Sequence, residues 1–248
     1  MVDILSKEDI SCIRETKSFP EKYVLNEWYN KQFPLVKHTH QEIVDLPEIV
    51  FNNLKKDVAE ESFFIKPMPK FEYYTCPLYT DTTGDWYSIA NNNTPGELKW
   101  RQKFAHEEGK PKEFSGTWLP NKFLKPFTNS FLQTIPGFVQ AKYYMMKPGM
   151  IIHNHLDSPY YSYLTFHVPF TFTDDVNYYI FGKKFKMFSP KMYWINTGLP
   201  HMVIKNKNPG NRVNLIIIAK TVKPYLEQLA DTRNNIIDWY SKGLKTWI

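Results

Sequence analysis

The stretch from 138 to 220 constrains the fold most, because it divides into eight short apolar or alternating runs with turn residues between them. Turns are marked by segments such as Lys147-Pro-Gly149 and Asn208-Pro-Gly-Asn211. Eight short strands at this spacing are typical of a jelly roll. We therefore expect a mainly β chain with flanking α-helices, built on a double-stranded β-helix (jelly-roll, cupin-like) core. The expected strands are 138–146, 150–155, 162–172, 177–181, 184–188, 192–196, 201–205 and 212–220.

The sequence on either side of this stretch indicates helices and short strands of the same domain. A chain of 248 residues with 42% hydrophobic residues can bury one substantial core, so a single domain over 1–248 is expected. Residues 1–137 are assigned to N-terminal helices, including one at 47–60, extra strands, including one at 71–79, and active-site loops. The core is 138–220, and 221–248 forms an amphipathic C-terminal helix suited to buttressing the core or to a dimer contact.

Charge and cysteine content argue against several classes of protein. The net charge is +6, but no Arg/Lys-rich helix or zinc-finger spacing accompanies it, so nucleic acid is not the expected partner. Cys12 and Cys76 lack the spacing of a metal or disulfide framework. The charged start has no signal-peptide pattern, and the most apolar run, 215–219, is too short to span a bilayer. We expect a cytoplasmic protein without membrane contact.

Three side chains have the identity and spacing of a non-haem iron site. His155 and Asp157 form a His-x-Asp pair at the end of the second expected strand, and His201 opens the seventh. A jelly roll can bring these two strands together although they are distant in sequence. Two imidazoles and one carboxylate leave open positions on Fe(II), enough for a bidentate 2-oxo acid and O₂. The sequence therefore predicts His155, Asp157 and His201 as metal ligands, catalytic in that role.

Two other interpretations of these residues stay open. His153 shares a strand face with His155 if the strand is regular, so His153, His155 and His201 would form a three-histidine, cupin-like site. We prefer Asp157 because the carboxylate downstream is not a Glu at the cupin spacing, and we place His153 beside the metal or in the pocket. In the other interpretation the histidines are ordinary strand residues and Asp157 belongs to a turn.

Arg212 is the candidate cosubstrate residue, because it opens the apolar run Arg-Val-Asn-Leu-Ile-Ile-Ile-Ala, which is suited to a buried strand. A buried guanidinium needs an anion, and its planar fork matches a carboxylate. Tyr144, on the first expected strand, is our candidate for a hydroxyl that completes the carboxylate's hydrogen bonds. The alternative is an internal ion pair between Arg212 and an acidic side chain.

Four sequence pieces, in order, resemble the aspartyl/asparaginyl β-hydroxylase-like family of Fe(II)/2-oxoglutarate oxygenases. They are Lys147-Pro-Gly149 followed by His155, then Tyr163-Leu-Thr-Phe-His-Val-Pro169, then Trp194-Ile-Asn-Thr-Gly-Leu-Pro-His201, then Asn211-Arg-Val-Asn-Leu-Ile216. The resemblance covers about 138–220. It implies that His155 and His201 bind the metal, that Arg212 holds the distal carboxylate of 2-oxoglutarate, and that His167 neighbours it. Thr165 stands where family members often have a cosubstrate-binding Arg, which puts that contact in doubt.

The expected function is Fe(II)- and 2-oxoglutarate-dependent hydroxylation of an amino-acid side chain, free or in a polypeptide, with O₂ as the oxidant. Candidate substrate contacts outside the core are Trp86, Tyr87, Arg101 and Trp118. The alternatives are a cupin-like metal enzyme that uses no 2-oxo acid and a jelly-roll binding or structural module without enzymatic activity.

Overall fold

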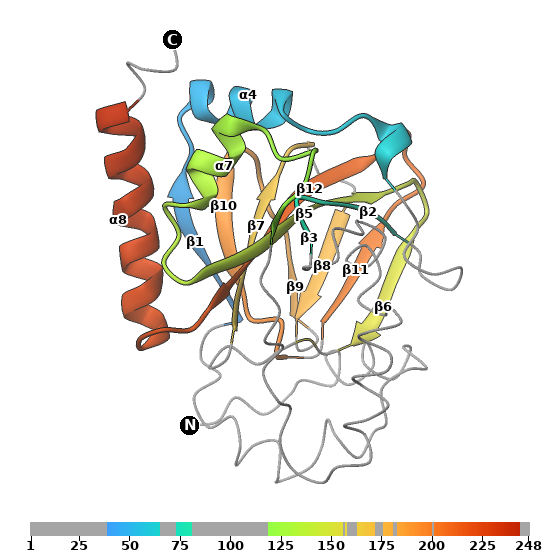
Figure 1. Cartoon of the computed structure of the whole chain (residues 1–248). Helices are drawn as coiled ribbons and strands as arrows, with labels where there is room; N and C mark the ends of the chain where they lie inside the picture. The colour runs from blue at the N-terminus through green and yellow to red at the C-terminus, as the bar shows by residue number, and fades with distance from the viewer. Residues whose placement is uncertain are drawn as a thin grey trace, which may run out of the picture.

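Two antiparallel sheets form the centre of the computed structural model (Figure 1). The structure describes residues 39–64, 73–80, 119–155, 157, 163–171, 176–180, 183–199 and 201–243. The six-stranded sheet has the order β1-β10-β7-β12-β5-β2, and the four-stranded sheet has the order β6-β11-β8-β9. The strands are β1 His40–Asp45, β2 Tyr74–Pro77, β5 Phe138–Met146, β6 Ile151–His155, β7 Tyr163–Pro169, β8 Val176–Ile180, β9 Lys183–Phe185, β10 Lys191–Ile195, β11 His201–Lys205 and β12 Arg212–Lys220.

The eight strands from β5 to β12 form a double-stranded β-helix. Strands β5, β7, β10 and β12 belong to the larger sheet, while β6, β8, β9 and β11 form the smaller one, so the chain crosses repeatedly between the two sheets. This topology confirms the predicted fold class and the eight expected strands. Strand β7 ends at Pro169, earlier than predicted, and β9 ends at Phe185. Strands β1 and β2 extend the larger sheet at its two edges.

Strand β12 shows how one sheet serves two separate cores. Leu215, Ile217 and Ala219 pack into the larger apolar cluster on one face of the six-stranded sheet. Ile216 packs against the second cluster, which combines residues of both sheets, such as Tyr144 of β5 and Val203 of β11. Successive side chains of a strand point to opposite faces. The even-numbered positions of β12 therefore face the interior between the sheets.

Helices cover the outer face of the six-stranded sheet (Figure 1). The helix expected at 47–60 is α4, Glu48–Lys56, which is followed by the short η1, Glu61–Phe63. The others are α7, Pro126–Leu132, and α8, Tyr225–Gly243, which lies beside β1. A small two-stranded sheet joins β3, Tyr79–Thr80, to β4, Leu119–Pro120. Each helix buries apolar residues against the sheet: Val50 and Leu54, Phe131 and Leu132, Leu229 and Ile236.

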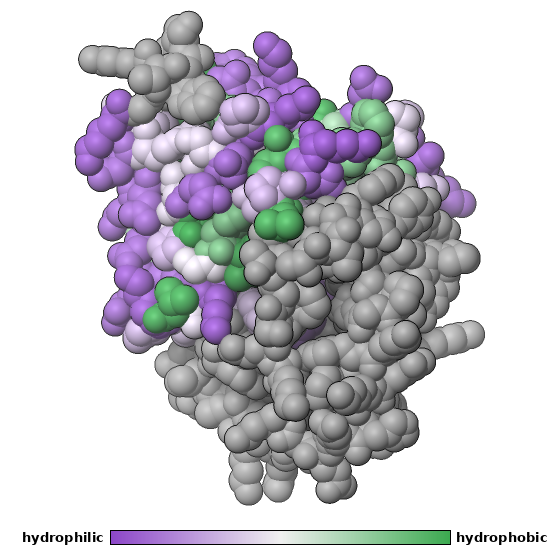
Figure 2. Space-filling view, viewed as in Figure 1, coloured by the Kyte–Doolittle hydropathy of each residue, from purple (hydrophilic) through white to green (hydrophobic). Residues whose placement is uncertain are grey.

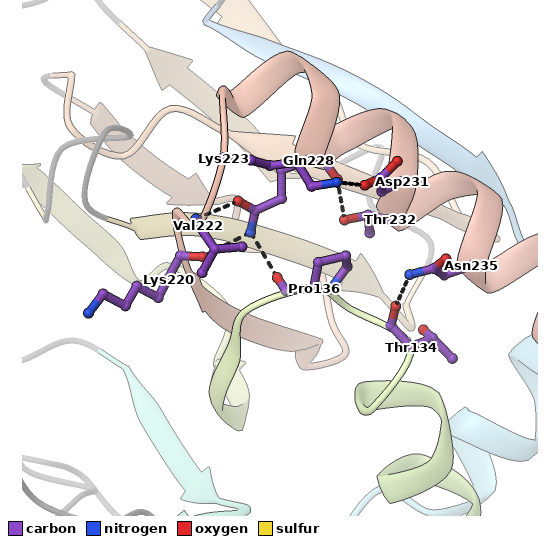
Figure 3. Close-up of polar contacts among 9 residues, drawn as sticks. All are labelled: Thr134, Pro136, Lys220, Val222, Lys223, Gln228, Asp231, Thr232 and Asn235. Atoms are coloured by element: carbon purple, nitrogen blue, oxygen red, sulfur yellow. Dashed lines mark hydrogen bonds and ion pairs between the residues drawn. The ribbon is translucent and has the colours of Figure 1, made fainter.

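Helix α8 is held in place by a buried glutamine as well as by apolar contacts (Figure 3). Gln228 is 0% exposed, and its Nε2 donates to the carbonyls of Pro136 at 2.8 Å and Lys220 at 2.9 Å. Its Oε1 accepts a hydrogen bond from the Val222 backbone N–H at 2.9 Å. Farther along the helix, the Asn235 side chain donates to the Thr134 carbonyl. Gln228 therefore ties the helix to the segments that precede β5 and follow β12.

Gly137 completes the same junction. Its φ is +71°, and an added Cβ would lie 2.3 Å from the carbonyl oxygen of Lys220. Its carbonyl also accepts a hydrogen bond from Lys220 N–H at 2.7 Å. A residue with a side chain would be strained in this conformation and would clash with the backbone, so the close approach of the two segments requires glycine.

Hydrophilic residues dominate the described surface over α8, and the hydrophobic ones form small, separate groups (Figure 2). The large apolar side chains that the structure shows exposed are Ile49, Phe63, Leu119, Phe188, Val222 and Leu226. In the part of the chain that the structure describes, no helix combines the length and apolar character needed to cross a membrane. A dimer contact through α8 stays a prediction.

Candidate active site

The ladder between β6 and β11 places the two predicted metal-binding histidines opposite each other. His201 is the Cα partner of His155, and Val203 is the partner of Ile152. From Val203 to His201 is two residues, but from Ile152 to His155 is three, so β6 carries one extra residue here. The side chain of His155 lies outside the described part of the structure. Its role as a ligand stays a prediction.

This irregularity corrects one step in the sequence reasoning. Residues i and i+2 share a face only in an uninterrupted strand. The register shift falls between Ile152 and His155, so the spacing of His153 and His155 no longer implies that they share a face. His153 is exposed. A regular strand was the basis for the three-histidine site, and β6 is not regular at that position.

Asp157 and His201 approach each other at this end of the sheet. Asp157 Oδ2 lies 3.6 Å from His201 Nε2. The Asp157 backbone N–H donates to the Thr197 carbonyl at 2.9 Å, which holds Asp157 against the segment between β10 and β11. His201 is 5% exposed and Asp157 is 51% exposed, so the pair sits at the edge of the interior rather than deep within it.

The hydrogen bond on the other side of the His201 ring orients it. His201 Nδ1 lies 2.9 Å from the Leu199 carbonyl oxygen, which can only accept, so Nδ1 carries the proton. In the neutral ring, Nε2 then presents a lone pair toward the Asp157 carboxylate. Two metal–ligand bonds of about 2.1 Å can join atoms at this separation. The donor set therefore fits a divalent cation, although among the described side chains no group of three or more His, Cys, Asp or Glu forms a metal site.

Arg212 is a buried cation on the interior face of β12. It is 1% exposed. One terminal nitrogen donates to Tyr178 Oη at 3.4 Å, the other lies 3.4 Å from Met146 Sδ, and the guanidinium carbon lies 5.0 Å from the Tyr178 ring centroid. Within the described residues Arg212 forms no ion pair with Asp or Glu, and its Nε has no hydrogen-bond partner. The internal ion pair considered as an alternative is not found there.

His167 lies on the neighbouring strand β7 and is 3% exposed. Its Nδ1 is 2.7 Å from Asn214 Nδ2 and 3.4 Å from Tyr178 Oη. Burial, followed by the positive charge of Arg212, lowers the pKa of His167 well below its usual 6.5, so the ring is neutral at pH 7. Its Nε2 is buried without a hydrogen-bond partner in the described residues.

Tyr144 lies within electrostatic reach of both Arg212 and Asp157. Burial raises the pKa of Tyr144 well above 10.0; Tyr73, Tyr178 and Asp157 raise it further, while Arg212 lowers it. The Tyr73 ring stacks on Tyr144 with centroids 4.6 Å apart. Burial and then Asp157 raise the pKa of Tyr73 to about 12. Both phenols therefore stay neutral at physiological pH, and the interior of the site carries few formal charges.

Thr165 occupies an inward position of β7, in contact with Thr197, the residue that also binds the Asp157 backbone. Its hydroxyl oxygen lies 3.0 Å from that of Thr197, and both residues are buried. Of the predicted cosubstrate residues, the structure thus buries Arg212, Tyr144, His167 and Thr165 on the inner side of one sheet. Trp86, Tyr87, Arg101 and Trp118 lie outside the described residues, so their predicted substrate contacts stay predictions.

Sequence reasoning missed Tyr178, Asn214 and Tyr73. Asn214 could have been found, because it stands two residues after Arg212 on the same strand and so shares its face. Tyr178 occupies the central inward position of β8, between Val176 and Ile180. No local pattern distinguishes it from an ordinary core aromatic.

Comparisons with known proteins give similarities of fold at low sequence identity. No protein-family model matches the sequence, and no curated protein matches it. Among solved structures, a prolyl-4-hydroxylase from Pseudomonas putida is 14% identical, with a TM-score of 0.41 over 77% of this chain and 96% of that one. HygX from Streptomyces hygroscopicus, solved with nickel, 2-oxoglutarate and hygromycin B, is 10% identical, with a TM-score of 0.41 over 80% and 88%. A 2OG-Fe(II) oxygenase family oxidoreductase from Burkholderia pseudomallei is 13% identical, with a TM-score of 0.39 over 78% and 89%.

Proposed function

We propose that this protein is an Fe(II)- and 2-oxoglutarate-dependent hydroxylase that acts on an amino-acid side chain, free or within a polypeptide. His155, Asp157 and His201 would hold the metal. Arg212 would bind the distal carboxylate of 2-oxoglutarate, with Tyr144, His167 and Thr165 around the cosubstrate.

The observation that carries the proposal is the state of Arg212. An arginine keeps its charge at any physiological pH, and burying a charge without a partner is costly. Arg212 is 1% exposed, with no carboxylate paired to it among the described residues and with an unpartnered Nε–H. A bound dicarboxylate would supply the missing anion, and a guanidinium binds a carboxylate through two parallel hydrogen bonds.

The composition of the interior favours a 2-oxo acid over a phosphate or a large polar ligand. The side chains that contact Arg212, Met146 and Tyr178, are neutral and belong to the apolar cluster between the sheets. A ligand there would have one charged end at Arg212 and an apolar middle. The methylene carbons of 2-oxoglutarate match such an interior, and its other end would reach the metal ligands.

The metal with its cosubstrate and O₂ supplies the oxidising power for C–H hydroxylation, with release of succinate and CO₂. The protein binds, orients and shields. His201 is fixed by the Leu199 carbonyl, Asp157 by the Thr197 carbonyl, and Arg212 by Tyr178. The buried tyrosines Tyr144 and Tyr178 keep water away from the cosubstrate end.

The cupin-like ligand set receives less support. Asp157 Oδ2 lies 3.6 Å from His201 Nε2, whereas His153 is exposed on a strand whose alternation is broken before His155. These observations favour the carboxylate as the third ligand.

The test is an anaerobic titration of the apoprotein with Fe(II) and 2-oxoglutarate, monitored by the visible metal-to-ligand charge-transfer band. Asp157→Ala should not form the band because it should not bind Fe(II). Arg212→Gln should still bind Fe(II) but should require a much higher 2-oxoglutarate concentration to form the band. Arg233→Gln, which changes an exposed arginine on α8, is the matched control. A band that forms equally well in Arg212→Gln would refute the assignment of Arg212, and failure of the wild type to bind Fe(II) would refute the enzyme.

A further inference from the structure

Asn214 is a fully buried amide at the centre of the polar contacts in the interior. It lies on β12 two residues after Arg212 and is 0% exposed. Its Nδ2 is 2.7 Å from His167 Nδ1, and its Oδ1 has no hydrogen-bond partner in the described residues. The hydrogen bond from Asn214 therefore bears on which nitrogen of the His167 ring carries the proton.

Two donors converge on His167 Nδ1. The first is the amide of Asn214, whose nitrogen can only donate. The second is the Tyr178 hydroxyl at 3.4 Å: because Arg212 donates to Tyr178 Oη, the hydroxyl proton is available for Nδ1. A ring nitrogen that receives hydrogen bonds cannot itself carry a proton. The proton of the neutral ring must therefore be on Nε2.

The consequence is a second buried donor on the inner face of the sheet that carries Arg212. His167 Nε2–H and Arg212 Nε–H are both buried without protein acceptors among the described residues. Leaving a buried donor without an acceptor costs about 1–3 kcal/mol each, so a ligand with oxygen acceptors gains by satisfying both. With the opposite tautomer, Nε2 would present a lone pair, which repels an anionic oxygen.

We propose that Asn214 is a positioning residue that holds His167 in the Nε2–H tautomer, so that His167, like Arg212, donates a hydrogen bond to an oxygen of the bound cosubstrate. The identity of that cosubstrate as a 2-oxo acid rests on the function proposed above. The tautomer does not, because it follows from contacts within the chain.

The tautomer can be measured directly on the metal-free protein. Long-range ¹H–¹⁵N correlation spectra at pH 7 distinguish a protonated from an unprotonated ring nitrogen, and the His167→Phe spectrum identifies the resonances of His167 by their loss. We expect unprotonated Nδ1 and protonated Nε2 in the wild type. In Asn214→Asp, a carboxylate that can only accept replaces the donor, so Nδ1 should become protonated. A protonated Nδ1 in the wild type, or an unchanged His167 in Asn214→Asp, would overturn the proposal.

A double-mutant cycle tests whether Asn214 acts through His167. Asn214→Leu is nearly isosteric and should weaken 2-oxoglutarate binding to the Fe(II) protein about tenfold, the effect of one lost charge-assisted hydrogen bond. In a His167→Phe background the same substitution should change binding less than twofold. An undiminished tenfold loss in that background would show that Asn214 acts directly or through the fold. If the wild type does not bind 2-oxoglutarate, the proposed function fails, and the spectra still decide the role of Asn214.

Discussion

Replacing Gln228 with Met tests how the C-terminal helix is attached to the jelly roll. Met is close to Gln in size and flexibility, so the change removes the amide and keeps most of the packing. Three backbone groups lose their hydrogen bond to Gln228, the carbonyls of Pro136 and Lys220 and the N–H of Val222. Gln228 itself is 0% exposed, so water does not readily replace its amide.

The expected loss follows from these three groups. A buried group left without a partner costs about 1–3 kcal/mol, but Lys220 and Val222 are exposed residues, so water can partly replace the bonds lost there. We therefore expect Gln228→Met to lower the free energy of unfolding by about 2–3 kcal/mol. For a chain of this size, that corresponds to a fall in Tm of roughly 5–10 °C.

The assay is urea denaturation followed by circular dichroism, with Asn235→Met as the matched control on the same helix. Asn235 makes a single exposed bond to the Thr134 carbonyl, so its replacement should cost less than about 1 kcal/mol. If Gln228→Met lost no more stability than Asn235→Met, the reasoning that the buried amide anchors α8 would be wrong.

Three further predictions follow from other parts of the molecule. Gly137→Ala should lower the free energy of unfolding by about 2–4 kcal/mol in the same assay, because the position has a φ of +71° and the added Cβ would lie 2.3 Å from the Lys220 oxygen. A change below about 0.5 kcal/mol would contradict the close approach of the two segments. Arg212→Met should leave the unfolding free energy unchanged or raise it by about 1 kcal/mol or more, since it replaces a buried cation that has no acidic partner among the described residues with an apolar side chain. A large destabilisation would mean that Arg212 is a structural residue. Burial lowers the pKa of His167 below 6.5, so the contribution of its neutral ring to stability is complete above pH 6.5 and is lost as the pH falls through the folded-state pKa. The wild type should therefore lose more stability than His167→Gln between pH 7 and pH 5. Equal loss in the two proteins would argue against a buried neutral ring.

The fold was predictable because the core strands combine strong alternation with clear turn residues. Strand β12 and strand β11 have the predicted bounds, Arg212–Lys220 and His201–Lys205. Strand β1 was not predicted. Its register shifts between Glu42 and Val44, so Ile43 and Val44 are buried in succession and the alternation that signals a strand is lost.

The sequence predicts candidate site residues whose chemistry follows from residue type, but it does not predict contacts that depend on strand register. A lone arginine heading an apolar strand indicates a buried cation, and the structure buries Arg212. The extra residue in β6 has no sequence signal, since neither a Gly nor a Pro stands between Ile152 and His155, and it removes the inference that His153 and His155 share a face. The contact of Asn214 with His167 joins two strands, so sequence spacing alone could not identify it.

The two faces of β12 carry residues in different environments: one row faces the interior between the sheets, and the other packs under the helices. Arg212 and Asn214 share a strand with Leu215 and Ile217 but face the opposite side of the sheet. During evolution the inward side chains can change, and with them any ligand that the interior binds, while the outward side chains keep the helices packed on the sheet. Because successive side chains of β12 alternate between the two faces, substitutions on one face need not disturb the packing on the other.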